Sequence, residues 1–140
     1  MRLGIDFGTT RIVVAASDRG NYPVVAFETM EDEVCDWFPP LAGVRGAERI
    51  YGWQAWAAQT DPQATVVRSL KRFLSGAGPQ TPVEIGGQLT TLSTILQELA
   101  QALHTALRER SNLQLPAGER LEVMLGVPAS ANSNQRFLTV

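Results

Sequence analysis

Hydrophobic and polar residues alternate at the start of the chain. Residues 2–7 place Leu3, Ile5 and Phe7 on one face and polar or small residues on the other. This period of two predicts a strand with one buried face. The pattern resumes over Arg11–Ser17 and again over Tyr22–Phe27, and turn residues separate the three segments. We therefore expect the chain to open as a three-stranded antiparallel meander, followed by an acidic loop over Glu28–Asp36.

The middle of the chain mixes strand and helix patterns. Short strands are predicted at Leu41–Val44 and Glu48–Tyr51, and a small hairpin at Val83–Ile85 with Gln88–Thr90. Apolar residues at helical spacing, with capping residues and helix-ending glycines, predict three helices. They are expected at Trp53–Gln59, from Asp61 to about Leu74, and over about Leu92–Arg110. We interpret the Trp53 and Trp56 pair as packing, and His104 as a residue of the helix surface.

The last apolar segment is Leu121–Val127, which has apolar residues on both faces. Such a run is typical of a central strand covered on both sides. A turn rich in small residues follows, and a helix is predicted to start near Ser133. Strands with inserted helices favour a mixed α/β class. We predict a core sheet subdomain from residues 1–36 and 115–140, with an inserted subdomain over residues 37–114.

Composition narrows the functional classes. The 140 residues are 44% hydrophobic and 19% charged with a net charge of −2, which is ordinary for a globular domain and disfavours a nucleic-acid partner. The single cysteine, Cys35, excludes an internal disulfide. No secretory leader is recognisable and no apolar run is long enough for a membrane span, so we expect a cytoplasmic protein with no membrane partner.

The stretch Gly4-Ile5-Asp6-Phe7-Gly8-Thr9-Thr10 carries the most chemistry. Asp6 falls on the strand face opposite the apolar residues, beside Gly4, and close to a turn with two hydroxyls. Successive N–H groups in a turn suit phosphate oxygens, and a nearby carboxylate suits hydrated magnesium. The pattern indicates a site for a Mg-nucleotide polyphosphate. A plain hairpin turn is the alternative, and a P-loop is excluded because its lysine motif is missing.

Four segments in the same order resemble one family. Gly4–Arg11 resembles the first phosphate motif of the superfamily that contains actin, the sugar kinases and the heat-shock chaperones. The next three resemble parts of the seventy-kilodalton chaperones of DnaK type: Glu48–Gly52, Asp61–Leu74 and Val123–Arg136. The resemblance implies an α/β, actin-like ATPase fold (ribonuclease H-like motif). The chain would form an incomplete first lobe with a mixed sheet and an inserted helical subdomain.

The resemblance also implies roles for single residues. Asp6 would hold Mg²⁺ through water, and Gly8, Thr9, Thr10 and Arg11 would contact the phosphates of ATP or ADP. Lys71 would act with Asp6 in catalysis by reaching the γ-phosphate and the attacking water. Pro128 and Arg136 would couple the nucleotide state to a substrate-binding domain. The partners implied for the full-length protein are unfolded client proteins and co-chaperones.

Two departures from the family pattern stand out. Arg11 occupies a position where the chaperones usually carry a small polar residue, and the loop Glu31-Asp32-Glu33 is more acidic than is typical. The second phosphate loop and the adenosine pocket of the family are not in these residues. We therefore expect an N-terminal fragment of an ATP-binding chaperone that is inactive alone and self-associates through uncovered strand edges.

Three alternatives stay open at this point. An actin-like, filament-forming ATPase of the cell-shape type shares the first phosphate motif and a similar segment around Pro128. A sugar kinase shares only the first motif. A nucleotide-free scaffold of the same fold would use the chain as an interaction module, and Arg11 is the one sequence feature that favours it.

Overall fold

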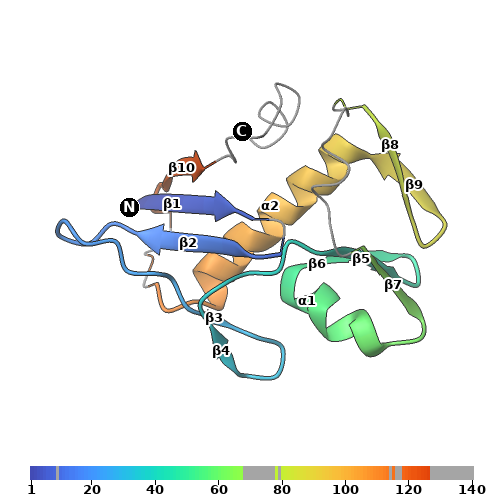
Figure 1. Ribbon diagram of the computed structural model, residues 1–140, viewed down its shortest axis with the longest axis horizontal. Coiled ribbons are helices and arrows are strands. Elements are labelled where there is room, and N and C mark those ends of the chain that lie inside the picture. Colours follow the sequence, from blue (N-terminus) through green and yellow to red (C-terminus); the bar gives the residue numbers. More distant parts are fainter. Residues whose placement is uncertain (9, 68–77, 79, 114, 116–117, 127–140) are drawn as a thin grey trace.

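A three-stranded mixed sheet lies at the centre of the fold. The computed structural model describes residues 1–8, 10–67, 78, 80–113, 115 and 118–126. β1 (Arg2–Phe7) pairs antiparallel with β2 (Ile12–Ala16) and parallel with β10 (Glu122–Gly126), which gives the order β10-β1-β2. Figure 1 shows β1 between its two neighbours, although β1 and β10 come from opposite ends of the described chain. The first two predicted strands are confirmed.

The third strand of the predicted meander forms only a single antiparallel bridge, between Ala15 and Val24. Residues 22–27 run beside β2 through two backbone hydrogen bonds, from Ala16 N–H to the Pro23 carbonyl and from Val25 N–H to the Val14 carbonyl. Proline has no N–H to donate, so a continuous ladder cannot form there. The acidic segment Glu28–Asp36, which we expected to be a loop, contains β4 (Val34–Cys35). This strand pairs with β3 (Phe27–Glu28), which begins at the last residue of the predicted third strand.

A second three-stranded sheet, of order β6-β5-β7, follows in the chain. The hairpin of β5 (Ala42–Arg45) and β6 (Glu48–Tyr51) confirms two predicted strands, and it leads into α1 (Gly52–Ala57) and the 3-10 turn η1 (Ala58–Thr60). The helix expected from Asp61 is wrong over the part that the structure describes, because Ala64–Val67 form β7 along β5. Asp61 does accept a bond from Gln63 N–H, but the β-branched run after it favours a strand.

One long helix packs against the central sheet. The hairpin of β8 (Pro82–Ile85) and β9 (Gln88–Thr91) leads directly into α2 (Leu92–Glu109), where the Thr91 side chain caps Thr94 N–H. Both elements confirm their predictions. Figure 1 shows α2 running diagonally behind β1 and β2 to the β8–β9 hairpin. Its buried stripe belongs to the same hydrophobic core as residues of β1 and β2; the stripe consists of Leu92, Ile95, Leu99, Leu103 and Leu107.

β10 differs from its prediction as a doubly covered strand. Val123 is 53% exposed and Met124 is 78% exposed. β1 pairs with one edge of β10, and no described strand pairs with the other. In the described part of the chain, these two apolar residues of β10 therefore lie on the surface.

The described residues thus form a mixed α/β structure with a mixed sheet and two α-helices. None of the helices in these ranges has the length and apolar character needed to cross a membrane.

Candidate functional site

Asp6 lies on the open face of the central sheet. Side chains alternate along β1, so Leu3, Ile5 and Phe7 face α2, whereas Gly4 and Asp6 face the other way. In the register, Asp6 is flanked by Val13 of β2 and by Gly126 of β10. The Asp6 side chain is exposed, and no described residue forms an ion pair with its carboxylate.

Two glycines leave space beside this carboxylate. A Cβ built on Gly4 would meet no atom within 4 Å, and one on Gly126 would lie 3.5 Å from the Ile5 carbonyl oxygen. Side chains would fit at both positions, so packing of the sheet does not require glycine at either. The absence of side chains at both positions leaves space beside the Asp6 carboxylate on this face.

The turn after β1 closes by a backbone hydrogen bond. Gly8 N–H donates to the Arg11 carbonyl over 2.9 Å, and a Cβ at residue 8 would lie 2.5 Å from that oxygen. Any larger residue at position 8 would collide with the Arg11 carbonyl oxygen, so this turn requires glycine there. The bond also means that Gly8 N–H is engaged within the turn and is not directed at a ligand. Thr10 is exposed, and Thr9 lies outside the described residues.

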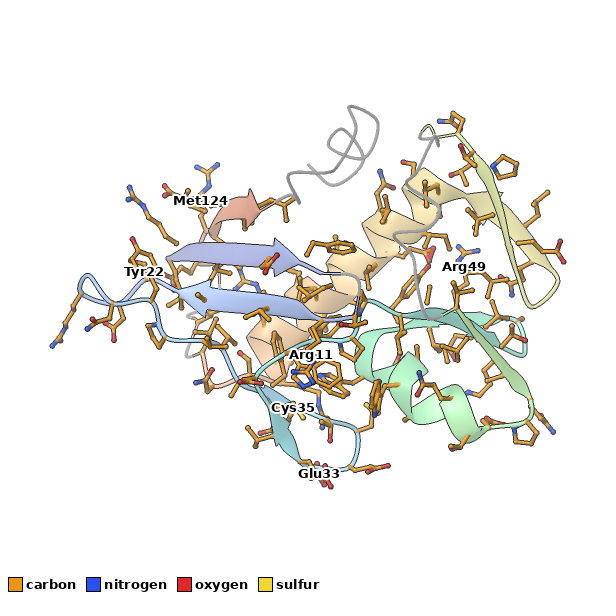
Figure 2. All side chains as sticks on the ribbon, viewed as in Figure 1. Arg11, Tyr22, Glu33, Cys35, Arg49 and Met124 are labelled. Atoms are coloured by element: carbon orange, nitrogen blue, oxygen red, sulfur yellow. The ribbon has the colours of Figure 1, made fainter. Side chains whose placement is uncertain are left out.

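The Arg11 side chain lies over an aromatic ring. Its guanidinium carbon is 4.9 Å from the centre of the Trp37 ring, a cation–π geometry. Backbone hydrogen bonds in both directions between Ile12 and Phe38, each 2.8 Å long, hold the two segments together. Arg11 therefore lies where the central sheet meets the region of α1 (Figure 2).

Trp37 belongs to a cluster of three indoles. The ring centres of Trp37 are 4.9 Å from Trp53 and 5.2 Å from Trp56, and the latter two are 5.8 Å apart. The tilted and edge-on arrangements are those that aromatic rings prefer. The predicted packing of Trp53 with Trp56 is confirmed. No local pattern in the sequence indicates Trp37 as a member of this cluster, since only the folded chain brings it to this pair and to Arg11.

One buried group in this cluster lacks a hydrogen bond. Trp53 is 6% exposed, and its indole N–H has no acceptor in the described part of the chain. Buried polar groups are usually paired, so an unpaired donor here reduces the stability of the cluster. No signal in the sequence indicates it.

A polar cluster connects β6 to α2. Arg49 donates through both Nε and Nη2 to the Glu98 carboxylate, and the Tyr51 hydroxyl donates to the same carboxylate over 2.7 Å. The hydrogen bond from Arg49 lowers the pKa of Glu98 below its ordinary value. Burial, and then the bond to Glu98, raises the pKa of Tyr51. The hydrogen bond between Arg49 and Glu98 also raises the pKa of Arg49, so this ion pair stays charged across the neutral range.

An apolar groove lies on the opposite face of the sheet from Asp6. It has a volume of about 920 Å³ and lies between α2 and the strands β1 and β10. Its lining is mostly aliphatic, with Leu96, Leu103 and Val123 among its members. The lining also includes Arg108 and Arg120, but Asp6 faces away from the groove, so the groove is not part of the same site.

The structure brings together part of the predicted site. Asp6, Gly8, Thr10 and Arg11 lie at one end of β1 and the turn that follows it. The other predicted site residues lie outside the described residues; they are Thr9, Lys71, Pro128 and Arg136. The described ranges contain no group of three or more histidine, cysteine, aspartate or glutamate side chains that could hold a metal ion. Hydrated Mg²⁺ can bind through a single carboxylate and does not need such a group.

Comparison with known proteins does not place the chain in a family. No protein-family model matches it, and no curated protein matches it either.

Proposed function

We propose that the chain is the first part of an actin-like ATPase domain of the DnaK chaperone type. In the full-length protein, binding and hydrolysis of Mg-ATP would drive the binding and release of unfolded client proteins. The observation that carries the proposal is the position of Asp6. It is an exposed carboxylate at the end of a strand, beside two glycines that leave its face open and next to a tight turn.

The residues present fit a hydrated magnesium ion with a polyphosphate. Asp6 would accept hydrogen bonds from water bound to Mg²⁺, and the space above Gly4 leaves room for that water. When bound, Mg²⁺ would supply positive charge to offset the phosphate oxygens. The Thr10 hydroxyl and backbone N–H are candidates for phosphate contacts, since Gly8 N–H is already engaged. Lys71 would stabilise charge on the transferred phosphoryl group.

A specific observation favours a second candidate function. Gly8 N–H bonds within the turn, and the Arg11 side chain lies on Trp37 rather than over the turn. A scaffold of the same fold that binds no nucleotide would have these features. In that case the open face around Asp6 would be a surface without a ligand.

Isothermal titration of the chain with Mg-ATP at millimolar concentration distinguishes the two candidates. The matched variant is Asp6→Asn, which keeps the shape of the side chain and removes its charge. We expect wild-type binding that weakens at least about tenfold in the variant, because hydrogen bonds to a charged group contribute about 1.5–3 kcal/mol. Equal binding by the two proteins would contradict the role of Asp6, and no binding by the wild type would favour the scaffold.

A further inference from the structure

Arg11 is part of the turn beside Asp6, yet its charge is directed elsewhere. Its carbonyl closes the turn by accepting the Gly8 N–H, so its backbone is fixed at the candidate phosphate site. Its guanidinium lies 4.9 Å from the Trp37 ring centre, and no described carboxylate forms an ion pair with it. The turn therefore carries an arginine whose charge is offset only by an aromatic face in the described part of the chain.

The two partners differ in their freedom to move. Trp37 contacts both Trp53 and Trp56, and the residue after it is bonded to Ile12 through its backbone in both directions. The Arg11 side chain is exposed, and its guanidinium has no hydrogen bond or ion pair with a described residue besides its place over the Trp37 ring. A change at this site would move the arginine and leave the indole in place.

A polyphosphate would compete with Trp37 for the guanidinium. An exposed cation–π contact is weaker than a pair of charge-assisted hydrogen bonds to phosphate oxygens, for which the planar guanidinium is well shaped. A ligand at the turn would therefore draw Arg11 from the ring. The ring would in turn reduce the affinity, because part of the binding energy is used to separate it from Arg11.

We propose that Trp37 holds Arg11 away from the turn in the unliganded protein, and that a bound polyphosphate takes Arg11 from Trp37 as its ligand. This inference rests on the proposed function, since it concerns the same site. It makes Arg11 a binding residue and Trp37 a residue that limits affinity. It also gives the phosphate site a link to the indole cluster beside α1.

A double-mutant cycle tests the competition, with Mg²⁺ and inorganic tripolyphosphate as the probe in isothermal titration. Arg11→Ala should weaken binding about tenfold, and Trp37→Leu should tighten it about threefold. In the double variant the gain from Trp37→Leu should disappear, because the indole acts only through Arg11. Tighter binding from Trp37→Leu even without Arg11, or no change from either single variant, would overturn the inference.

Tryptophan fluorescence gives a second readout that needs no change to the indole cluster. Adding Mg-tripolyphosphate to the wild type should change the emission as the guanidinium leaves Trp37, and Arg11→Ala should abolish that change. If Trp37→Leu does not fold, this comparison decides the matter alone. An identical change in the wild type and in Arg11→Ala would show that Arg11 does not move.

The inference and the proposed function fail separately. If Mg-ATP binding depends on Asp6 but neither Arg11→Ala nor Trp37→Leu alters it, the inference is wrong and the function stands. If tripolyphosphate moves Arg11 but Mg-ATP binding ignores Asp6→Asn, the inference stands and the function does not. If the wild type binds neither compound, the inference is wrong, and the proposed function loses the support of the site around Asp6 in this chain.

Discussion

Gly52, the first residue of α1, lies against the ring of Phe38, so that a Cβ at residue 52 would overlap the Cζ atom of that ring. Its φ of +57° is also in the region that favours glycine. Phe38 is 2% exposed and bonded to Ile12 through its backbone, so it cannot move away easily. This contact connects the start of α1 to the central sheet.

Gly52→Ala should therefore destabilise the protein strongly. We expect a loss of about 3 kcal/mol in the free energy of unfolding, since backbone strain and overpacking act together. Urea denaturation followed by circular dichroism would measure it. Gly46→Ala is the matched control, because Gly46 has a φ of +64° but no atom within 4 Å of a built Cβ. An equal loss in both variants would show that the Phe38 contact contributes nothing.

The ion pair between Arg49 and Glu98 should stabilise the junction of β6 and α2. Glu98→Gln should lower the free energy of unfolding by about 1–2 kcal/mol, because a bidentate, charge-assisted contact is replaced by a neutral one. A cycle with Arg49→Met should give a coupling energy of about 1 kcal/mol. Glu122→Gln is the control: its pair with Arg2 has side chains 71% and 76% exposed, and its removal should cost little. Similar losses at both pairs would contradict this ranking.

The lowered pKa of Glu98 in this cluster indicates that the stability of the folded protein falls at acidic pH. The pKa of Glu98 is lowered by its bond from Arg49, so the folded state favours the charged carboxylate. The resulting stability is present above the ordinary value of 4.5 and is lost as the pH falls through the lower folded pKa. Denaturation from pH 7 down to pH 3 should show a smaller loss for Glu98→Gln than for the wild type. Parallel curves would show that Glu98 does not contribute.

The raised pKa of Tyr51 indicates that the folded protein loses stability at alkaline pH. Burial raises the pKa of its hydroxyl above the ordinary value of 10.0, so the folded state favours the neutral form. That contribution is complete below pH 10.0 and is lost as the pH rises above it. Tyr51→Phe should be less sensitive than the wild type between pH 10 and pH 12 in thermal unfolding. A wild type that loses no more stability than Tyr51→Phe in this range would contradict the prediction.

Elements with a strong local pattern were predictable from the sequence. α2 follows from leucines at helical spacing, and the hairpins β5–β6 and β8–β9 follow from short alternating runs around glycines. β7 was missed because the Asp61-Pro62 pair is typical of a helix start, while pairing with β5 decides the structure of Ala64–Val67. In this case tertiary pairing outweighs the local signal.

The candidate site was predictable only along β1. Alternation places Asp6 opposite the buried residues, and the structure agrees. The position of the Arg11 side chain was not predictable, because Trp37 reaches it through the bridge between Ile12 and Phe38. The open space at Gly126 likewise depends on the parallel register of β10 with β1, which distant segments determine.

Gly4 offers a test of the site that leaves the fold intact. A side chain at residue 4 would project from the same face as Asp6 and would meet no atom within 4 Å. Gly4→Val should keep or raise the thermal midpoint, since valine favours strands and glycine weakens them. It should nevertheless weaken Mg-tripolyphosphate binding, with Gly4→Ala intermediate, because the added methyl groups occupy the space beside the carboxylate. Unchanged binding in Gly4→Val would place the ligand elsewhere.

The exposed strand β10 predicts self-association of the 140-residue chain. Val123 and Met124 are exposed, and the outer edge of the strand pairs with no described residue, so its backbone groups can pair with a second copy. We expect dimers or larger soluble species in light scattering at high concentration. Met124→Lys should shift the chain toward the monomer, because a charge on a strand edge opposes pairing. Tyr22→Lys is the control, since Tyr22 is 67% exposed but lies outside the strands (Figure 2). A monomeric wild type, or an equal effect of both variants, would show that β10 is not the contact.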